Sequence, residues 1–131
     1  LQEQYGTAMI LITHDLGIVA EICDDVAIMY AGCIMEYGSK EAIFTDARHP
    51  YTTGLFGCIP DLYADQSELR PIKGLMPDPA NLPQGCPFAP RCALAAERCR
   101  TEMPPPAEAA PGHMTRCFAP EALSAGKGAA S

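Results

Sequence analysis

The chain has 131 residues and a formal net charge of −7. An acidic chain with no basic run argues against nucleic acid as its partner. No apolar run is long enough to span a bilayer and no signal peptide is visible, so we expect a soluble domain that reaches membranes only through partner proteins. Because the chain opens at Leu1 with what reads as the end of a helix, we expect it to be part of a longer protein.

The first regular element is a run of apolar and Thr residues, 7–13, which predicts a strand buried on both faces of a parallel sheet. Asp15 follows and can cap a helix whose apolar face recurs through residues 16–23. Two further apolar runs, 26–30 and 33–37, flank an Ala-Gly turn and predict a β-hairpin. These patterns together indicate the α/β class.

Two short helices complete this unit. Ser39 can cap the first helix, and His49 shapes the turn into the second, whose first helical residue is Pro50. Pro60 ends the second helix. We therefore expect an α/β unit over residues 1–60.

The chain changes character after this unit, since eleven of the thirteen prolines lie at or beyond Pro71. We expect a linker over 61–70 and a loop-rich appended module over 71–120, with one or two helical turns around 93–100. Residues 121–131 are small and polar and predict a disordered tail.

His14 stands just beyond the predicted buried strand, in the sequence MILITHD. In open α/β sheets the carboxyl ends of the strands form the edge where ligands bind. A histidine there can donate a hydrogen bond to a phosphate oxygen or position a water molecule. The alternative is a surface histidine that merely ends a strand, and the motif alone does not separate the two.

The run ILITHDLGIVAEICDDVAIMYAGCIMEYGSKEAIF resembles the region that follows the Walker B strand in ABC-type ATPases. The match covers residues 1–60, and THD, VAEICDDVAIMYAG and the EYG turn follow one another in the order of that family. The resemblance implies the C-terminal part of a P-loop ABC ATPase domain. It also implies that His14 is the switch histidine, which contacts the γ-phosphate of ATP and helps arrange the attacking water.

Most of the machinery for ATP hydrolysis is missing from these residues. There is no G-x-x-x-x-G-K-[ST] phosphate loop, no Gln loop, no LSGGQ-type signature and no Walker B Asp-Glu pair. Phosphoryl transfer requires the backbone cradle, a Lys, Mg²⁺ and a residue that polarises water. We expect an ABC-type ATPase that binds ATP and Mg²⁺ in the intact protein, and no ATPase activity from this stretch alone.

Four of the seven cysteines fall in one proline-rich stretch with the spacing C-x5-C-x6-C-x17-C: Cys86, Cys92, Cys99 and Cys117. Four thiolates suffice for a tetrahedral zinc site or for the four corners of an iron–sulfur cluster. The long gaps favour a cluster over a single ion. Four arginines against three acids between the first and last of these cysteines suit an anionic centre, which would also staple a module with little core of its own.

Other interpretations of these cysteines remain open, namely buried free thiols or two disulfides. His113 lies four residues before the last of them and could replace a ligand, although a role beside the ligands or an exposed position is favoured. Cys23 and Cys58 lie on apolar helix faces and are predicted to belong to the core.

The ABC core, the HPYTTGL motif and the GCPFAPRC module with its later cysteines together resemble the peptide/nickel transport family of ABC ATPases, as far as Pro120. The resemblance implies a 4Fe–4S cluster on Cys86, Cys92, Cys99 and Cys117. Cys33 departs from the family, which usually has a basic or other polar residue there.

The resemblance implies the energy-coupling subunit of a dipeptide or oligopeptide importer. It implies four kinds of partner or contact: a second ABC ATPase subunit, two transmembrane permease subunits, indirectly an extracytoplasmic peptide-binding protein, and the cytoplasmic face of the bacterial inner membrane. The competing hypothesis is a stand-alone iron–sulfur or zinc-binding interaction module without an ATPase role.

Overall fold

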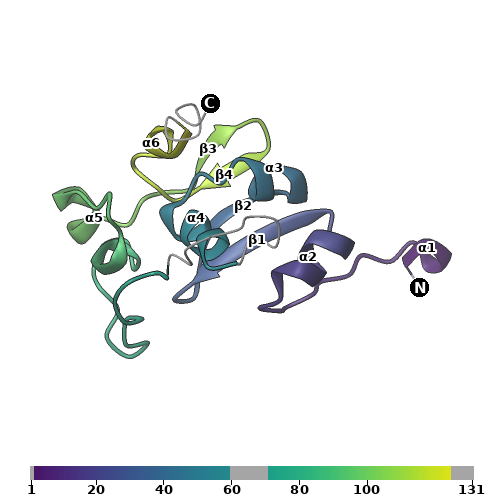
Figure 1. Ribbon diagram of the computed structural model, residues 1–131, viewed down its shortest axis with the longest axis horizontal. Coiled ribbons are helices and arrows are strands. Elements are labelled where there is room, and N and C mark those ends of the chain that lie inside the picture. Colours follow the sequence, from purple (N-terminus) through teal and green to yellow (C-terminus); the bar gives the residue numbers. More distant parts are fainter. Residues whose placement is uncertain (1, 60–70, 125–131) are drawn as a thin grey trace, which may run out of the picture.

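The structure is a computed structural model and describes residues 2–59 and 71–124. A four-stranded antiparallel sheet with the order β1-β2-β4-β3 lies at its centre, and helices lie along the sheet and at both ends of the molecule (Figure 1). The strands are β1 (Asp25–Tyr30), β2 (Cys33–Ser39), β3 (Ala107–Ala110) and β4 (His113–Thr115). The helices are α1 (Gln2–Tyr5), α2 (Leu16–Ile22), α3 (Lys40–Thr45), α4 (Pro50–Gly57), the 3₁₀ turn η1 (Ala89–Arg91), α5 (Glu97–Thr101) and α6 (Glu121–Ser124).

The predicted hairpin is confirmed as β1 and β2. Its two turn residues, Ala31 and Gly32, have φ of 48° and 79°. Two consecutive residues in the left-handed region form the turn whose twist matches that of the flanking strands. Gly32 takes up this conformation without the steric cost that a side chain carries.

The two predicted helix caps, Asp15 and Ser39, are confirmed, and His49, predicted to shape the turn into α4, is the cap of that helix. An Asp15 side-chain oxygen accepts hydrogen bonds from two amides of the first turn of α2, at 2.9 and 3.2 Å. The Ser39 hydroxyl accepts from an amide of α3 at 3.2 Å, and the His49 ring accepts from an amide of α4 at 3.0 Å. These local bonds satisfy amides that have no partner inside a helix.

The strand predicted over residues 7–13 is wrong for this structure, because these residues have extended or irregular backbone without strand pairing. They are also exposed rather than buried: the side chains of Ile10 and Ile12 are 91% and 95% exposed. A strand needs a neighbour for its amide and carbonyl groups. Within the described residues no strand pairs with this run, which leads into α2 on the outside of the sheet (Figure 1).

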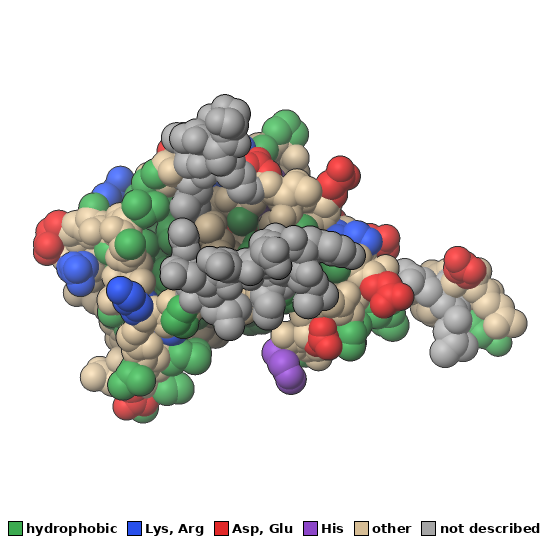
Figure 2. All heavy atoms as spheres, viewed as in Figure 1, with side chains coloured by type: hydrophobic (Ala, Val, Ile, Leu, Met, Phe, Trp, Pro, Cys, Tyr) green, Lys and Arg blue, Asp and Glu red, His purple; other side chains and the backbone are tan. Residues whose placement is uncertain are grey.

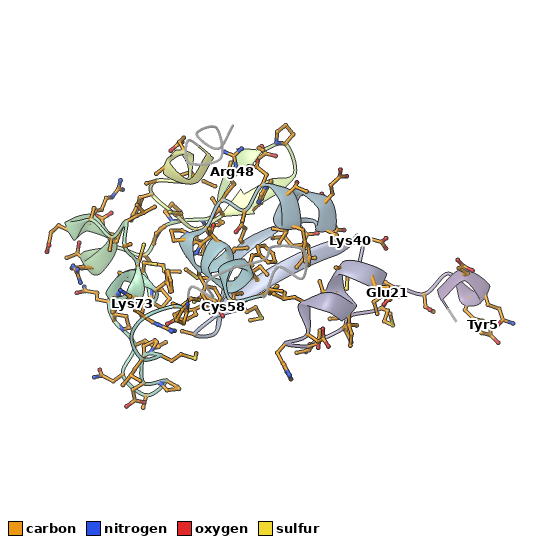
Figure 3. The ribbon with its side chains drawn as sticks, viewed as in Figure 1. Tyr5, Glu21, Lys40, Arg48, Cys58 and Lys73 are labelled. Atoms are coloured by element: carbon orange, nitrogen blue, oxygen red, sulfur yellow. The ribbon has the colours of Figure 1, made fainter. Side chains whose placement is uncertain are left out.

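Two apolar clusters form the core. One packs α2 and α3 against β1, and its buried members are Val19, Val26, Ile28 and Ile43. The half-buried Cys23 packs on this cluster, as predicted, whereas Cys58 is exposed at the end of α4 and does not belong to a buried core (Figure 3). The eight-residue helix α4 ends at Gly57, and Cys58 follows it as the C-cap, outside the packed face.

The second cluster joins the early strands to the later loops, with Tyr30, Met35, Cys86, Phe88 and Ala89 as its buried members. Rings pack closely here: Tyr30 lies 4.6 Å from Tyr51 and 5.4 Å from Phe88 between ring centroids. The loop-rich part of the chain therefore shares both its core and its sheet with residues 1–59.

The predicted linker over 61–70 lies outside the described residues. The region predicted as a disordered tail begins with α6, and the rest of that prediction also lies outside them. The helical turn expected around 93–100 is present as α5, and η1 forms a further turn just before that range. Exposed hydrophobic side chains also occur in the described residues that precede η1, among them Leu75, which is 91% exposed. Figure 2 shows hydrophobic side chains on the surface at the lower end of its view.

A buried carboxylate ties three distant segments together. Glu36 on β2 is 1% exposed, and its oxygens accept from the backbone amides of Arg48 and His49 at 2.5 and 3.1 Å. The ring of His113 on β4, 2% exposed, lies 2.6 Å from the same carboxylate. The expectation that His113 is exposed or stands beside the cysteines is therefore wrong, because this ring pairs with a buried acid.

We predict that Glu36→Gln lowers the free energy of unfolding by about 1–3 kcal/mol, because a neutral amide cannot accept all three hydrogen bonds. Urea unfolding of the intact protein measures this change. The control Glu41→Gln, on the exposed face of α3, should change stability by less than about 0.5 kcal/mol. Equal stability of the two variants would contradict the organising role of the Glu36 carboxylate.

Candidate functional site

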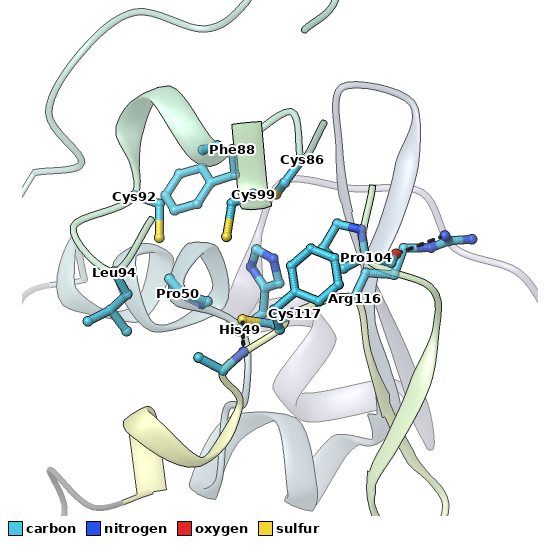
Figure 4. A pocket seen from close by; sticks show the side chains of 13 residues that line it. His49, Pro50, Cys86, Phe88, Cys92, Leu94, Cys99, Pro104, Arg116 and Cys117 are labelled. Carbon is cyan, nitrogen blue, oxygen red and sulfur yellow. Dashed lines mark hydrogen bonds between the residues drawn. The ribbon is translucent and has the colours of Figure 1, made fainter. Parts of the chain in front are cut away.

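The four clustered cysteines surround one cavity (Figure 4). They come from separate turns: Cys86 from the loop before η1, Cys92 from its end, Cys99 from α5 and Cys117 from the segment after β4. The cavity has a volume of about 30 Å³, room for about one or two water molecules. All four cysteines are thiols, so the two-disulfide interpretation is not realised in this structure.

Short backbone hydrogen bonds hold these turns. The Cys86 amide donates to the Cys99 carbonyl at 2.8 Å, which brings two of the cysteines together directly. Gly85 makes this approach possible, because a Cβ at that position would lie 2.3 Å from the Cys99 carbonyl oxygen. Any side chain there would push the loop away from α5. The glycine before the first cysteine is therefore part of the site, and sequence reasoning did not single it out.

Burial shapes the chemistry of the thiols. It raises the pKa of Cys86, Cys92 and Cys117 above the ordinary cysteine value, and repulsion among the four sulfurs raises the pKa further. Backbone amides act in the opposite direction and lower the pKa, as where the Ala119 amide donates to the Cys117 sulfur at 3.4 Å. Without a bound cation the cavity thus favours protonated thiols.

The four cysteine sulfurs are ligands that suit a soft metal ion. In this structure they do not lie close enough together to form a closed site for one ion. Among the described residues, no three His, Cys, Asp or Glu side chains lie close enough together to hold a metal ion. A single zinc ion requires its sulfur ligands within about 2.3 Å of one point. The four thiols instead stand around a shared space.

Cationic side chains border this space. The Arg98 guanidinium lies 4.0 Å from the ring centroid of Phe118, which also lines the cavity. Arg116 lines the cavity as well and donates to the Pro104 carbonyl at 3.4 Å. On the face shown in Figure 2, Lys and Arg are otherwise scattered among acidic side chains. Arg116 is thus the cationic side chain in the cavity lining, whereas Arg98 is exposed and pairs with Glu102 at 3.0 Å.

His49 forms part of the cavity wall, a position that sequence reasoning did not predict although it did place His49 at the turn into α4. Its side chain is 1% exposed, and burial lowers its pKa to about 4, partly opposed by a hydrogen bond to the backbone of Arg116. The ring is therefore neutral at neutral pH. The signal in the sequence was its place before Pro50, which fixes the start of α4 close to the cysteines.

The structure does not bring His14 to this cavity. His14 is exposed and precedes α2, whereas the cysteine-bearing turns around α5 lie at the other side of the molecule (Figure 1). Its neighbours are fixed, because the Asp15 amide donates to the Thr13 hydroxyl at 3.0 Å and Asp15 caps α2. The two predicted sites are thus separate, and His14 projects into solvent from an ordered turn.

Comparisons with known proteins show which family this chain resembles. The family model for the oligopeptide/dipeptide transporter C-terminal region matches residues 35–99. The oligopeptide transport ATP-binding protein OppD of Salmonella typhimurium is 47% identical over 121 residues, which are 92% of this chain and 36% of that protein. OppD of Haemophilus influenzae is 51% identical over 76% of this chain and 31% of its own length, and AppD of Bacillus subtilis is 42% identical over 90% and 36%.

The chain thus spans about a third of the length of these curated relatives. In the part of the chain that the structure describes, no helix combines the length and apolar character that crossing a membrane requires.

The depressed pKa of His49 predicts a loss of stability in mild acid. The unfolded chain binds a proton near pH 6.5 and the folded chain only near pH 4, so stability is full above about pH 6.5 and falls as the pH approaches 4. Between about pH 6.5 and pH 4, protonation of His49 in the unfolded chain lowers the free energy of unfolding by about 3 kcal/mol. Urea unfolding at several pH values should show it, and His49→Gln should flatten this part of the profile. An identical slope in both proteins would contradict the assignment.

Proposed function

Because this chain belongs to the oligopeptide/dipeptide transporter family of ATP-binding proteins, we propose that it is part of the energy-coupling subunit of an ABC peptide importer. The observation that carries this proposal is the match over about nine-tenths of the chain to proteins named for oligopeptide transport and ATP binding. None of the relatives described above supports the alternative of a stand-alone iron–sulfur or zinc module.

The proposed importer needs further parts, which this chain does not contain. ATP and Mg²⁺ bind to motifs outside these residues, and a second ATPase subunit completes the composite sites. Two transmembrane permease subunits convert ATP hydrolysis into transport, and an extracytoplasmic binding protein delivers the peptide. The intact subunit then lies at the cytoplasmic face of the inner membrane.

Within that assembly we assign His14 to the γ-phosphate of ATP. Two features support the assignment: the side chain is exposed, and the hydrogen bonds of Thr13 and Asp15 hold the turn that carries it. A neutral imidazole on an ordered turn can donate to a phosphate oxygen and orient water. Since the thiol cavity lies elsewhere, His14 acts independently of it.

In the intact transporter, His14→Ala should lower kcat for ATP hydrolysis by about 10²-fold or more while ATP still binds. ATP-dependent peptide uptake into reconstituted vesicles should fall in parallel. Glu21→Gln, exposed on the neighbouring helix α2, is the matched control and should keep wild-type rates (Figure 3). Wild-type hydrolysis by the His14 variant would refute its role, and an intact transporter without ATPase activity would refute the proposed function.

We also propose that Cys86, Cys92, Cys99 and Cys117 hold a 4Fe–4S cluster. Two features support this: four sulfur donors face one cavity, and the cationic side chain of Arg116 lines it. The present cavity of about 30 Å³ is small, so binding requires the turns around η1 and α5 to move apart. When bound, such a cluster supplies a cross-link among these turns and a one-electron centre.

The cluster is tested by anaerobic purification of the intact protein with iron, sulfide and zinc analysis and visible absorption. We expect about four irons and four sulfides per chain. Cys92→Ser should lose them, whereas Cys58→Ser, whose cysteine lies outside the cavity, should keep them. Stoichiometric zinc without iron would favour a single-ion site, and a colourless protein without metal would contradict both.

A further inference from the structure

The turn that carries Cys92 is attached to the fold by side-chain contacts that the proposed function does not explain. Phe88 and Ala89 anchor the start of η1 in the core, and Cys92 lies half-buried at the border of that cluster. The Cys92 amide donates to the Ala89 carbonyl at 3.3 Å, and the Ala95 amide donates to the Cys92 carbonyl at the same distance. These bonds stay inside the turn. The hydrogen bonds that join its end to more distant segments come from the side chain of Arg91.

The guanidinium group of Arg91 donates to three acceptors. Nε donates to the Lys73 carbonyl at 3.1 Å, and Nη2 donates to the Ile72 carbonyl at 3.2 Å. Nη1 donates to the Tyr30 hydroxyl at 3.3 Å. Tyr30 is the last residue of β1 and is 2% exposed, so this bond reaches the core. One planar group therefore joins β1, two successive carbonyls and the turn that leads into Cys92.

Two glycines fit the segment 72–74 to this arrangement. A Cβ on Gly54 of α4 would lie 2.8 Å from the Ile72 side chain, so this segment packs directly on α4. Gly74 has φ of 85°, and a Cβ there would lie 3.3 Å from Cγ of Arg91. The segment is thus placed by α4 on one side and by Arg91 on the other, and its two carbonyls are fixed acceptors.

The contribution of Arg91 differs from that of the other arginines near the cysteines. Arg116 lines the cavity, whereas Arg91 is not among the residues that line it. Arg98 is exposed and pairs within its own helix with Glu102. Arg91 alone of these three donates to segments more than 15 residues away in the sequence, at separations of 18, 19 and 61 residues. Its role is therefore to connect segments.

We propose that Arg91 is a positioning residue for Cys92, which it holds at the cavity by fixing the end of η1 to the carbonyls of Ile72 and Lys73 and to the Tyr30 hydroxyl. A lysine cannot replace it, because one nitrogen cannot span two successive carbonyls and a hydroxyl. This role rests on the proposed function only for the group that Cys92 binds. The positioning itself concerns the thiol form of the chain, so it can be tested whether or not a cluster binds.

Two variants weaken this connection to different degrees. Arg91→Lys keeps the positive charge but loses the planar set of donors. Tyr30→Phe removes only the hydroxyl acceptor and keeps the ring that packs against Phe88. The matched control is Arg98→Lys, because Arg98 also directly precedes a cysteine but is exposed and contacts Glu102 within α5.

The readout is the alkylation rate of each cysteine in the reduced, metal-free intact protein, followed by peptide mass spectrometry. Burial raises the pKa of Cys92, so a turn that opens more often exposes a thiol that ionises more readily. Arg91→Lys should speed alkylation of Cys92 by about fivefold relative to Cys23, and Tyr30→Phe should speed it by about threefold. The control should leave every cysteine within about 1.5-fold of the wild type.

An unchanged rate at Cys92 in Arg91→Lys overturns the proposal. An equal rise at Cys99 in the control also overturns it, because any arginine before a cysteine would then have the same effect. If Arg91→Lys raises the rates of all cysteines in parallel, the whole fold is loosened and Tyr30→Phe decides. A rise confined to Cys92 in that variant supports the proposal, and any other result overturns it.

A separate sample of the wild-type protein is offered iron and sulfide under anaerobic conditions. Failure to bind them refutes the proposed cluster, whereas the alkylation rates of the metal-free protein still decide the role of Arg91. The two proposals can therefore fail independently.

Discussion

The buried carboxylate of Glu36 is the interaction on which the rest of this structure depends. A carboxyl group at 1% exposure is costly to remove from water unless hydrogen-bonding partners surround it. Here two backbone amides at the start of α4 and the ring of His113 supply them. These partners lie 12, 13 and 77 residues away from Glu36 in the sequence. The hydrogen bonds of one carboxyl group therefore hold three distant segments of the chain together.

This closure explains how a loop-rich sequence acquires a defined shape. The segment around β3 and β4 is too short to bury a core alone, so it completes the sheet of the first part by pairing β4 with β2. The turns around η1 place Phe88 against Tyr30 and Tyr51 in a shared aromatic cluster. Prolines restrict the unfolded chain in this region and lower the entropy that ordering removes.

The same contacts position several of the residues that line the cavity. Glu36 fixes the start of α4, where His49 lies, and the ring of His49 lines the cavity together with Cys117. On the opposite side Gly85 lets the loop of Cys86 approach the carbonyl of Cys99. The cysteines therefore lie on turns that other parts of the fold hold, which suits a group that binds between them. His14 belongs to a different part of the molecule and does not depend on this arrangement.

The sequence by itself determined the features that rest on neighbouring residues. The caps Asp15 and Ser39, the turn into α4 at His49 and the turn at Ala31-Gly32 depend on hydrogen bonds and backbone angles within a few positions. Their patterns could therefore be recognised directly. The order of the motifs was also sufficient to predict the family, and the comparisons confirm that prediction.

Only the tertiary structure decided the features that depend on distant partners. Nothing near Glu36 in sequence shows that it meets His113, and nothing near His49 shows that it meets Arg116. The run 7–13 has the composition of a buried strand, yet strand formation requires a pairing partner that composition does not reveal. Local pattern states what a segment can form, whereas burial and hydrogen bonding across the fold decide what it does form.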